Sequence, residues 1–286
     1  MSHLMNNYGR LPVSFDHGQG VWLWDKEGHK YLDALAGIAV NSVGHAHPRL
    51  VRAIADQASK LIHCSNYFNI DLQEKVAEKL VEHSGLEAVF FCNSGLEANE
   101  CAIKIARKFG HAKGIEVPNI IVLKHAFHGR SIATLSATGN PSVREDFSPY
   151  TEGFIFVDES DLDGIRKIVE ENKNVVAIFF EPILGEGGVV PIDLSVIKGI
   201  REICDEHDLL MMCDEVQCGM GRSGKWFAHQ WAEIKPDVIT MAKGLAGGVP
   251  VGAVIVSEKA NIFKPGNHGS TFGGNPLAMR AALETL

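Results

Sequence analysis

The sequence has no long apolar run, no paired CxxC units and no block of like charge. Nothing in its 286 residues approaches the run of about eighteen apolar residues that suggests a membrane-spanning helix, and residues 1–20 lack the apolar core of a signal peptide. Six cysteines without paired CxxC units indicate neither a disulfide framework nor a zinc site. We therefore expect a cytoplasmic protein with reduced thiols and no membrane contact.

A basic excess is also absent, because the formal net charge is −8 at pH 7. Surfaces that bind nucleic acid normally carry clustered positive charge, so nucleic acid is not an expected partner. The histidines of "GHAHP" at 44–48 and the His-Cys pair at 63–64 offer no complete set of metal ligands, so we expect no metal ion. The chain does have an ordinary globular composition, with 45% hydrophobic and 22% charged residues.

Short apolar runs recur along the chain and alternate with amphipathic stretches of helical length. The runs lie at 89–91, 120–123, 154–157, 175–180, 209–213, 238–241 and 251–256. Helical patterns lie between them at 97–109, 161–172 and 195–207, and Ser160 is the expected N-cap of the second. Strands without polar alternation, separated by helices, are typical of a mainly parallel sheet covered on both faces. The predicted fold class is α/β, with a seven-stranded sheet.

The two ends of the chain have different patterns. Short alternating segments before position 45, with turn signals at 25–28, predict a small antiparallel region, and a helical pattern follows at 48–63 with Leu50, Ile54 and Leu61. The last residues, "GNPLAMRAALETL", are typical of a helix with no stop signal, so we expect the sequence to stop inside a larger protein. We divide it into an N-terminal segment, 1–45, and a large domain, 46–286.

Polar residues follow five of the predicted strands. In open parallel sheets, ligands bind beyond the carboxyl ends of the strands, so these segments are expected to converge on one rim. Any one of them could be a satisfied polar strand end, but five together indicate a binding site. The segments are "NSGLEANE" at 93–100, "KHAFHGRS" at 124–131, "EPILGEGG" at 181–188, "DEVQ" at 214–217 and "AKGLAGG" at 242–248.

The first segment turns a strand into a helix through Ser94 and Gly95. Backbone N–H groups at a helix N-terminus are unpaired and favour anions, which indicates a phosphate site. The segment matches neither GxxxxGK[ST] nor GxGxxG, which argues against a nucleoside triphosphate or a dinucleotide. The alternative is a plain capped helix.

Two further segments carry charged candidates. Arg130 could bind a carboxylate through two hydrogen bonds, or it could be a surface arginine beside a structural His128. Asp214, just beyond a buried strand, could hold a heteroaromatic ring nitrogen protonated and so make the ring an electron sink. The competing interpretation of Asp214 and Glu215, a metal-binding acid pair, needs a P-loop that the sequence does not have.

Lys243 stands at the end of a buried strand, followed by glycines. Desolvation favours the neutral amine over the ammonium, and a neutral amine can form a Schiff base with an aldehyde. The glycines of "KGLAGG" leave room for a flat ring. A phosphate site, an acid, an aromatic side chain and a buried lysine together suit pyridoxal phosphate.

The chain resembles the class III aminotransferases of fold type I, from about Pro12 to the last residue. The resemblance is carried by "LDALAGIAVNSVGHAHP", "NSGLEANECAIKIARK", "FHGRSIATLSATG", "EPILGEGGVVP", "CDEVQCGMGRSGKWFA", "MAKGLAGGVPVGA" and "HGSTFGGNPLA". It implies pyridoxal phosphate as cofactor, a homodimer with shared sites, and a small C-terminal domain that this sequence does not contain.

The resemblance also implies roles for residues around the cofactor. Lys243 would form the Schiff base and then move a proton. Asp214 would pair with the pyridine nitrogen, Gln217 would lie on the side of the phenolic oxygen, and Phe127 would stack on the ring.

The phosphate and the substrates would contact other positions. The resemblance implies that the backbone amides of Gly95 and Leu96 hold the phosphate, together with Thr271 of the neighbouring subunit. Arg130 would bind the carboxylate of the amino donor, with Ser270 nearby. Glu186 would act as a gate that admits the dicarboxylate substrate, whose arginine ligand would lie in the C-terminal domain.

The implied reaction moves the δ-amino group of N2-acetylornithine to 2-oxoglutarate, as in arginine biosynthesis. Alternatives with the same cofactor are ornithine, succinylornithine and 4-aminobutyrate aminotransferases and a semialdehyde aminomutase. An alternative of another class is a non-catalytic fragment that binds only the cofactor.

Overall fold

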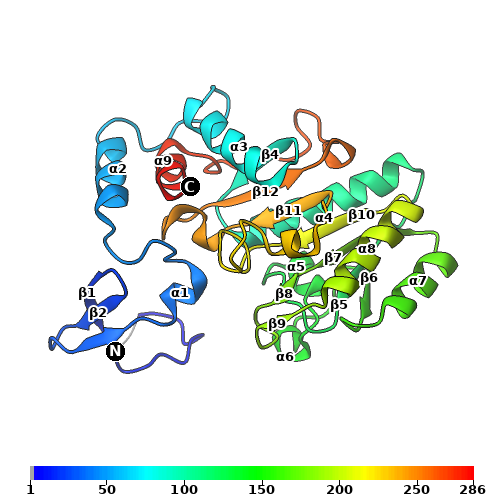
Figure 1. Ribbon diagram of the computed structural model, residues 1–286, viewed down its shortest axis with the longest axis horizontal. Helices are drawn as coiled ribbons and strands as arrows, with labels where there is room; N and C mark the ends of the chain where they lie inside the picture. The colour runs from blue at the N-terminus through cyan, green and yellow to red at the C-terminus, as the bar shows by residue number, and fades with distance from the viewer. Residues whose placement is uncertain (1–2) are drawn as a thin grey trace.

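The computed structural model describes residues 3–286, which form three sheets and the helices around them. A seven-stranded sheet runs through the larger part of the molecule, and the N-terminal strands lie at the opposite end from α7 (Figure 1). The strands are β1 Phe15–Gln19, β2 Trp22–Asp25, β3 Lys30–Leu32, β4 Ala88–Cys92, β5 Asn119–Leu123, β6 Phe154–Val157, β7 Val175–Phe180, β8 Ile183–Leu184, β9 Val190–Pro191, β10 Leu210–Asp214, β11 Val238–Met241 and β12 Gly252–Val256.

All seven strands predicted from the apolar runs belong to this one sheet. Their order is β4-β12-β11-β10-β7-β5-β6. Strand β12 is antiparallel to both of its neighbours, and the remaining neighbouring pairs are parallel. The strands on either side of β12 therefore point the same way, and the carboxyl ends of β4, β11, β10, β7 and β5 lie at one edge. The predicted α/β fold with a mainly parallel sheet is confirmed.

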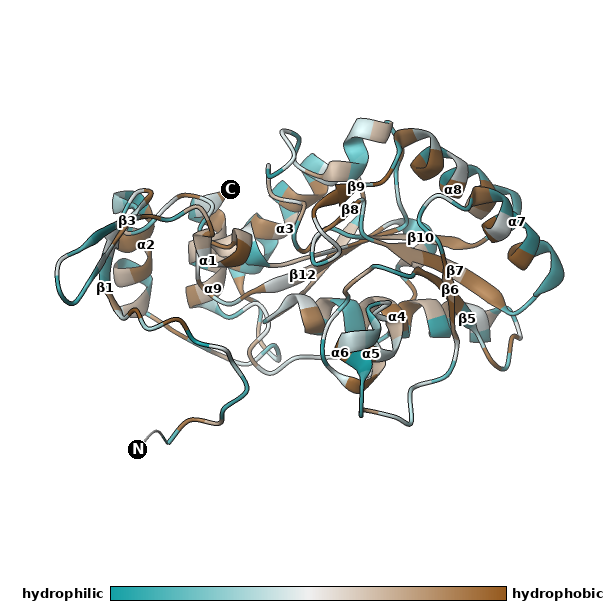
Figure 2. Ribbon diagram, turned by 90° about the horizontal axis from the view of Figure 1, so that it is seen from below, coloured by the Kyte–Doolittle hydropathy of each residue, from teal (hydrophilic) through white to brown (hydrophobic). Residues whose placement is uncertain are grey.

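Helices cover both faces of the sheet, as Figure 2 shows. Along β5 the side chains alternate between two apolar clusters: Ile120 and Val122 pack with α4, whereas Ile121 and Leu123 pack with α7 and α8. Both faces are buried, which explains why the strand sequences lack polar alternation. The helices are α1 Ala36–Ala39, α2 Pro48–Ala58, α3 Asp71–Ser84, α4 Gly95–Ala112, α5 Ile132–Ala137, α6 Pro141–Arg144, α7 Leu162–Glu171, α8 Leu194–Glu206 and α9 Pro276–Thr285, with short 3-10 turns η1 Ala228–Ala232, η2 Lys243–Ala246 and η3 Glu258–Ala260.

Two details of the helix predictions are wrong. The N-cap of α7 is Asp161 rather than Ser160, because the Asp161 carboxylate accepts the Gly164 N–H at 2.8 Å. The helix expected over 48–63 ends at Ala58, and Leu61 beyond it is 46% exposed. Helix α3 was not predicted, although Val76 and Leu80 stand four residues apart in it and are buried.

The N-terminal strands form a separate antiparallel sheet, β1-β2-β3, as predicted. The turn between β2 and β3 is organised by Asp25, whose carboxylate accepts the N–H groups of Glu27 and His29 and the hydroxyl of Tyr31. Within residues 3–286 no helix has both the length and the apolar character that a bilayer crossing requires.

Candidate active site

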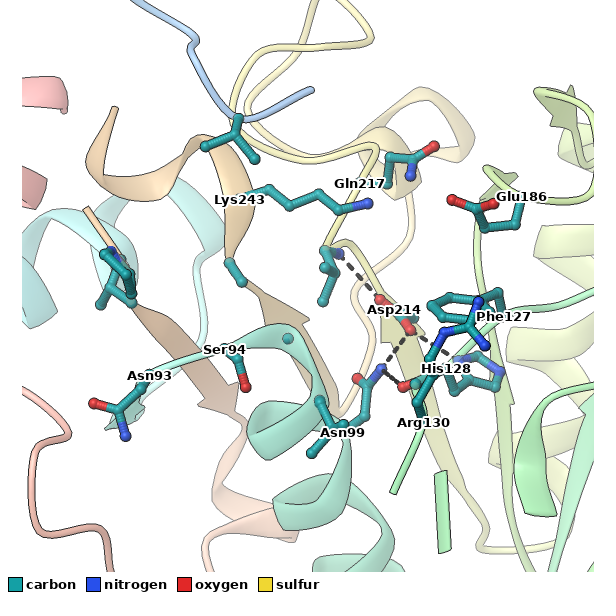
Figure 3. A pocket seen from close by; sticks show the side chains of 18 of the residues that line it. Asn93, Ser94, Asn99, Phe127, His128, Arg130, Glu186, Asp214, Gln217 and Lys243 are labelled. Carbon is teal, nitrogen blue, oxygen red and sulfur yellow. Dashed lines mark hydrogen bonds and ion pairs between the residues drawn. The ribbon is translucent and has the colours of Figure 1, made fainter. Parts of the chain in front are cut away.

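The polar segments that follow the strands of the large sheet surround one cavity of about 460 Å³. It lies at the edge where the parallel strands end (Figure 3). Eight of the predicted site residues line it, whereas Ser270 and Thr271 do not. The lining residues are Val40, Asn93, Ser94, Gly95, Leu96, Asn99, Phe127, His128, Gly129, Arg130, Glu181, Glu186, Asp214, Val216, Gln217, Ala242, Lys243, Gly248, Val249, Pro250 and Val251.

Lys243 is the first residue of η2, directly after β11, and its side chain extends into the cavity (Figure 3). Its φ of 40° lies in the left-handed region, which non-glycine residues rarely adopt and which is common at functional sites. Burial lowers the pKa of Lys243, and the acidic groups of Asp214 and Glu186 oppose only part of this effect. No ion pair to Lys243 is formed by the described residues. Losing a proton to form the neutral amine therefore costs less free energy at Lys243 than at an exposed lysine, as the sequence predicted.

Asp214 ends β10 and is 3% exposed. Its Oδ2 atom accepts hydrogen bonds from His128 Nδ1 at 2.8 Å and from Asn99 Nδ2 at 2.7 Å, and Oδ1 accepts the Val216 N–H at 3.0 Å. Because a carboxylate oxygen only accepts, this bond places a proton on Nδ1 of His128. Three donors thus fix the direction of a buried carboxylate that faces the cavity.

The N-terminus of α4 forms another part of the wall. Ser94 is its N-cap and accepts the Glu97 N–H, while the N–H groups of Gly95 and Leu96 have no acceptor within the helix. A Cβ on Gly95 would lie 2.6 Å from a methyl group of Val216, so only glycine fits there. The helix end therefore presents free backbone donors to an anion in the cavity.

Phe127, Gln217 and Glu181 also line the cavity. The Phe127 N–H donates to Glu181 Oε1 at 2.8 Å, and the Gly185 N–H donates to Oε2 at 3.1 Å. Burial, with a contribution from the charge of Asp214, raises the pKa of the Glu181 carboxyl to about 7. Glu181 therefore ties the loop that carries Phe127 to the loop that leads to Glu186.

Arg130 and Glu186 are exposed at the mouth of the cavity. The Arg130 guanidinium lies 5.7 Å from the centre of the Phe127 ring, and no carboxylate of the described residues pairs with it. A guanidinium without an acidic partner can bind a carboxylate from solution.

Ser270 and Thr271 lie outside this cavity. Ser270 Oγ accepts hydrogen bonds from Asn93 Nδ2 and from the Gly273 N–H, both at 3.0 Å. Ser270 is therefore linked to the cavity through Asn93. Thr271 is exposed to solvent.

The sequence-based interpretation assigned no role to Asn99 or Glu181. Each was visible as a polar residue in an apolar setting: Asn99 lies among the buried positions of α4, and Glu181 follows the continuous apolar run of β7. Both are buried and face the cavity.

Pyridoxal phosphate fits the chemistry of these residues. Lys243 offers an amine for its aldehyde, the N-terminus of α4 offers donors for its phosphate, and Asp214 offers a carboxylate for a protonated ring nitrogen. Two buried polar atoms at the cavity, Asn99 Oδ1 and His128 Nε2, have no partner within the described part of the chain. Such orphaned atoms are rare in folded proteins and indicate that a polar ligand or water completes the site.

Comparison with known proteins gives a consistent result. Residues 4–286 match the family described as "Aminotransferase class-III". The curated acetylornithine aminotransferase of Nitrosomonas europaea is 56% identical over 287 residues, which cover all of this chain and 73% of that protein.

Solved structures are similar over the same length. The crystal structure of the ornithine aminotransferase from Toxoplasma gondii ME49 has a TM-score of 0.95 and 36% identity, covering 99% of this chain and 68% of that chain. The acetylornithine aminotransferase from Elizabethkingia anophelis has a TM-score of 0.86 and 37% identity, covering 99% and 69%. These matches show that the chain belongs to the class-III aminotransferase family, and its sheet and cavity agree with that assignment.

Proposed function

We propose that this aminotransferase moves the δ-amino group of N2-acetylornithine to 2-oxoglutarate. The observation that carries the proposal is that Lys243, with its lowered pKa, shares one cavity with Asp214 and the free N-terminus of α4. Pyridoxal phosphate is the cofactor of the reaction, and when bound it supplies an electron sink for the carbon that carries the amino group. The curated relatives named as acetylornithine aminotransferases support the choice of donor.

The residues that would hold the cofactor come from α4, from the loop after β5, and from β10 with the loop that follows it. The backbone N–H groups of Gly95 and Leu96 would bind the phosphate, and Phe127 would cover one face of the ring. Asp214 would keep a proton on the ring nitrogen, and Gln217 would lie beside the phenolic oxygen. These roles are proposed from the positions of the side chains around the cavity.

Lys243 would carry the proton transfer. Its Nζ, whose pKa is lowered by burial, would accept the proton that the δ-carbon of the donor loses. The apolar surfaces of Val216 and Phe127 at the cavity wall exclude water from this step. Glu186, exposed at the mouth, is proposed to control the entry of the dicarboxylate 2-oxoglutarate.

Arg130→Ala is expected to raise the KM for N2-acetylornithine by about 10- to 100-fold, the effect of losing hydrogen bonds to a charged group. The reason is that Arg130 has no acidic partner among the described residues and is free to bind the donor carboxylate. Steady-state kinetics with N2-acetylornithine and with N-acetylputrescine, the same amide without the carboxylate, would measure the effect. An equal loss for both amines would contradict the assignment, because only one of them carries the group that Arg130 binds.

The choice of donor is tested by the first half of the reaction alone. We expect the near-ultraviolet and visible absorbance of bound pyridoxal phosphate to change faster with N2-acetylornithine than with ornithine, N2-succinylornithine or 4-aminobutyrate, each added without 2-oxoglutarate. The second candidate is ornithine aminotransferase, which the TM-score of 0.95 to such an enzyme favours. A faster change with ornithine would select that candidate and reject the first.

We also propose a cytoplasmic homodimer in which Thr271 contacts the phosphate in the site of a second copy. The support is that Thr271 is exposed and lies outside the cavity of its own chain, while the adjacent Ser270 is bonded to Asn93 of that cavity.

A further inference from the structure

Asn99 joins three of the elements that build the cavity. It lies in the second turn of α4, the helix whose N-terminus faces the cavity, and it is 2% exposed. Its Nδ2 atom donates to the carbonyl oxygen of His128 at 2.7 Å and to Oδ2 of Asp214 at 2.7 Å. One amide group therefore connects α4, the loop after β5 and the end of β10 (Figure 3).

The two partners determine which way the amide points. Both the His128 carbonyl and the Asp214 carboxylate can only accept a hydrogen bond, so the NH₂ group of Asn99 must face them. The reverse orientation would place Asn99 Oδ1 against two oxygen atoms. In the observed orientation Oδ1 has no partner in the described residues and is buried at the cavity wall.

The bond to Asp214 acts on the carboxylate itself. Donors aimed at an ionised carboxylate favour the charged form and fix its direction, and the effect is strongest where water is excluded. Asn99 is the donor that α4 supplies, in addition to His128 and the backbone N–H of Val216. A shift of α4 would therefore change the position of Asp214 as well as that of the phosphate donors.

We infer that Asn99 is a positioning residue, which holds the Asp214 carboxylate aimed at the ring nitrogen of the bound cofactor. The inference rests on the proposed function, in which Asp214 pairs with that nitrogen. It assigns to α4 a second task besides phosphate binding, because the same helix holds the acid that acts at the opposite side of the ring.

The test compares the binding of pyridoxamine 5′-phosphate to the apoprotein of four chains. This compound has no aldehyde and cannot bond covalently to Lys243, so its Kd reports the non-covalent contacts. The chains are the unsubstituted protein, Asn99→Ala, the isosteric Asn99→Asp, and Cys101→Ala. Cys101 is the matched control because it is fully buried on the same helix and does not line the cavity. Fluorescence titration at pH 6 and pH 8 gives each Kd as a ratio to the unsubstituted chain at that pH.

We expect Asn99→Ala to raise the Kd about tenfold at both pH values, and Cys101→Ala to leave it within about twofold. Asn99→Asp should have a larger effect at pH 8 than at pH 6. Two adjacent carboxylates share a proton at the lower pH, which restores one hydrogen bond to Asp214.

Other titratable groups surround Asp214, and they are the same in all four chains. Dividing each Kd by that of the unsubstituted chain at the same pH removes their contribution. These groups are His128, Glu181, Lys243, Glu215 and Cys218.

Kd ratios for Asn99→Ala and Asn99→Asp no larger than that of Cys101→Ala would overturn the inference. An equal effect of Asn99→Asp at both pH values would also overturn it, since packing alone does not depend on the proton. If circular dichroism shows that Asn99→Asp does not fold, the inference is tested by comparing the Kd ratio of Asn99→Ala with that of Cys101→Ala. Failure of the unsubstituted chain to bind the compound is a separate result, which would reject the proposed function and this inference together.

Discussion

Lys243→Ala is expected to lower the rate of amino transfer by on the order of 10⁴-fold or more, while the chain stays folded and still binds the cofactor. General acid–base catalysis by a positioned group contributes about 10²- to 10⁴-fold, and the loss of the nucleophilic amine adds to that. No other lysine lines the cavity of the described chain, so no neighbouring amine can replace it.

The experiment has a covalent readout in addition to turnover. Reduction with borohydride followed by peptide mass spectrometry should place the cofactor on the peptide that contains Lys243, and should find no adduct in Lys243→Ala. Lys235→Ala is the control, because Lys235 is exposed and lies outside the cavity. Normal turnover by Lys243→Ala, or an adduct on another lysine, would rule out the proposed role.

Asp214→Asn is expected to lower turnover by about 10²- to 10³-fold, the range found when one preorganised electrostatic group is removed from an active site. The amide has nearly the shape of the carboxylate but carries no charge, so it cannot hold a proton on a ring nitrogen. It also has one acceptor atom instead of two, and so loses a bond with Asn99, His128 or the Val216 N–H. Turnover should be measured per bound cofactor, so that weaker binding is not counted as slower chemistry.

Asp237→Asn is the matched control for this variant. Asp237 is also a buried, hydrogen-bonded aspartate and directly precedes β11, but it contacts Arg201 and the Met211 N–H and does not line the cavity. Its substitution should lower the free energy of unfolding and leave turnover per bound cofactor unchanged. If the two variants lose turnover equally, the effect of Asp214→Asn reflects stability, and its proposed role in catalysis is wrong.

The strands of the seven-stranded sheet were predictable because each contains an uninterrupted apolar run. Boundaries were less predictable, since they depend on single hydrogen bonds. Two adjacent residues, Ser160 and Asp161, can both cap a helix, and only the bond from Gly164 shows that Asp161 does so. Helix α3 was missed, although Val76 and Leu80 have the spacing of a buried helix face.

The site was predictable in outline for a different reason. Parallel strands end at one edge, so the residues that follow them, including Lys243 and Asp214, were expected to converge. The contacts within the site were not predictable, because they join residues that lie far apart in the sequence. Asn99 and Asp214 are 115 positions apart, so the pattern of α4 could indicate that Asn99 is buried but not which residue it bonds to.

The antiparallel strand β12 has a consequence for the order in which the site can form during synthesis. Strand β4 is an edge strand, and within residues 3–286 it pairs only with β12. Residues 88–92 therefore have no sheet partner until the ribosome has added residues 252–256, which takes roughly ten to thirty seconds at common translation rates. The N-terminus of α4, which follows β4, cannot be anchored beside Lys243 before then. A nascent chain that has already made its lysine still lacks the strand that fixes its phosphate donors in place.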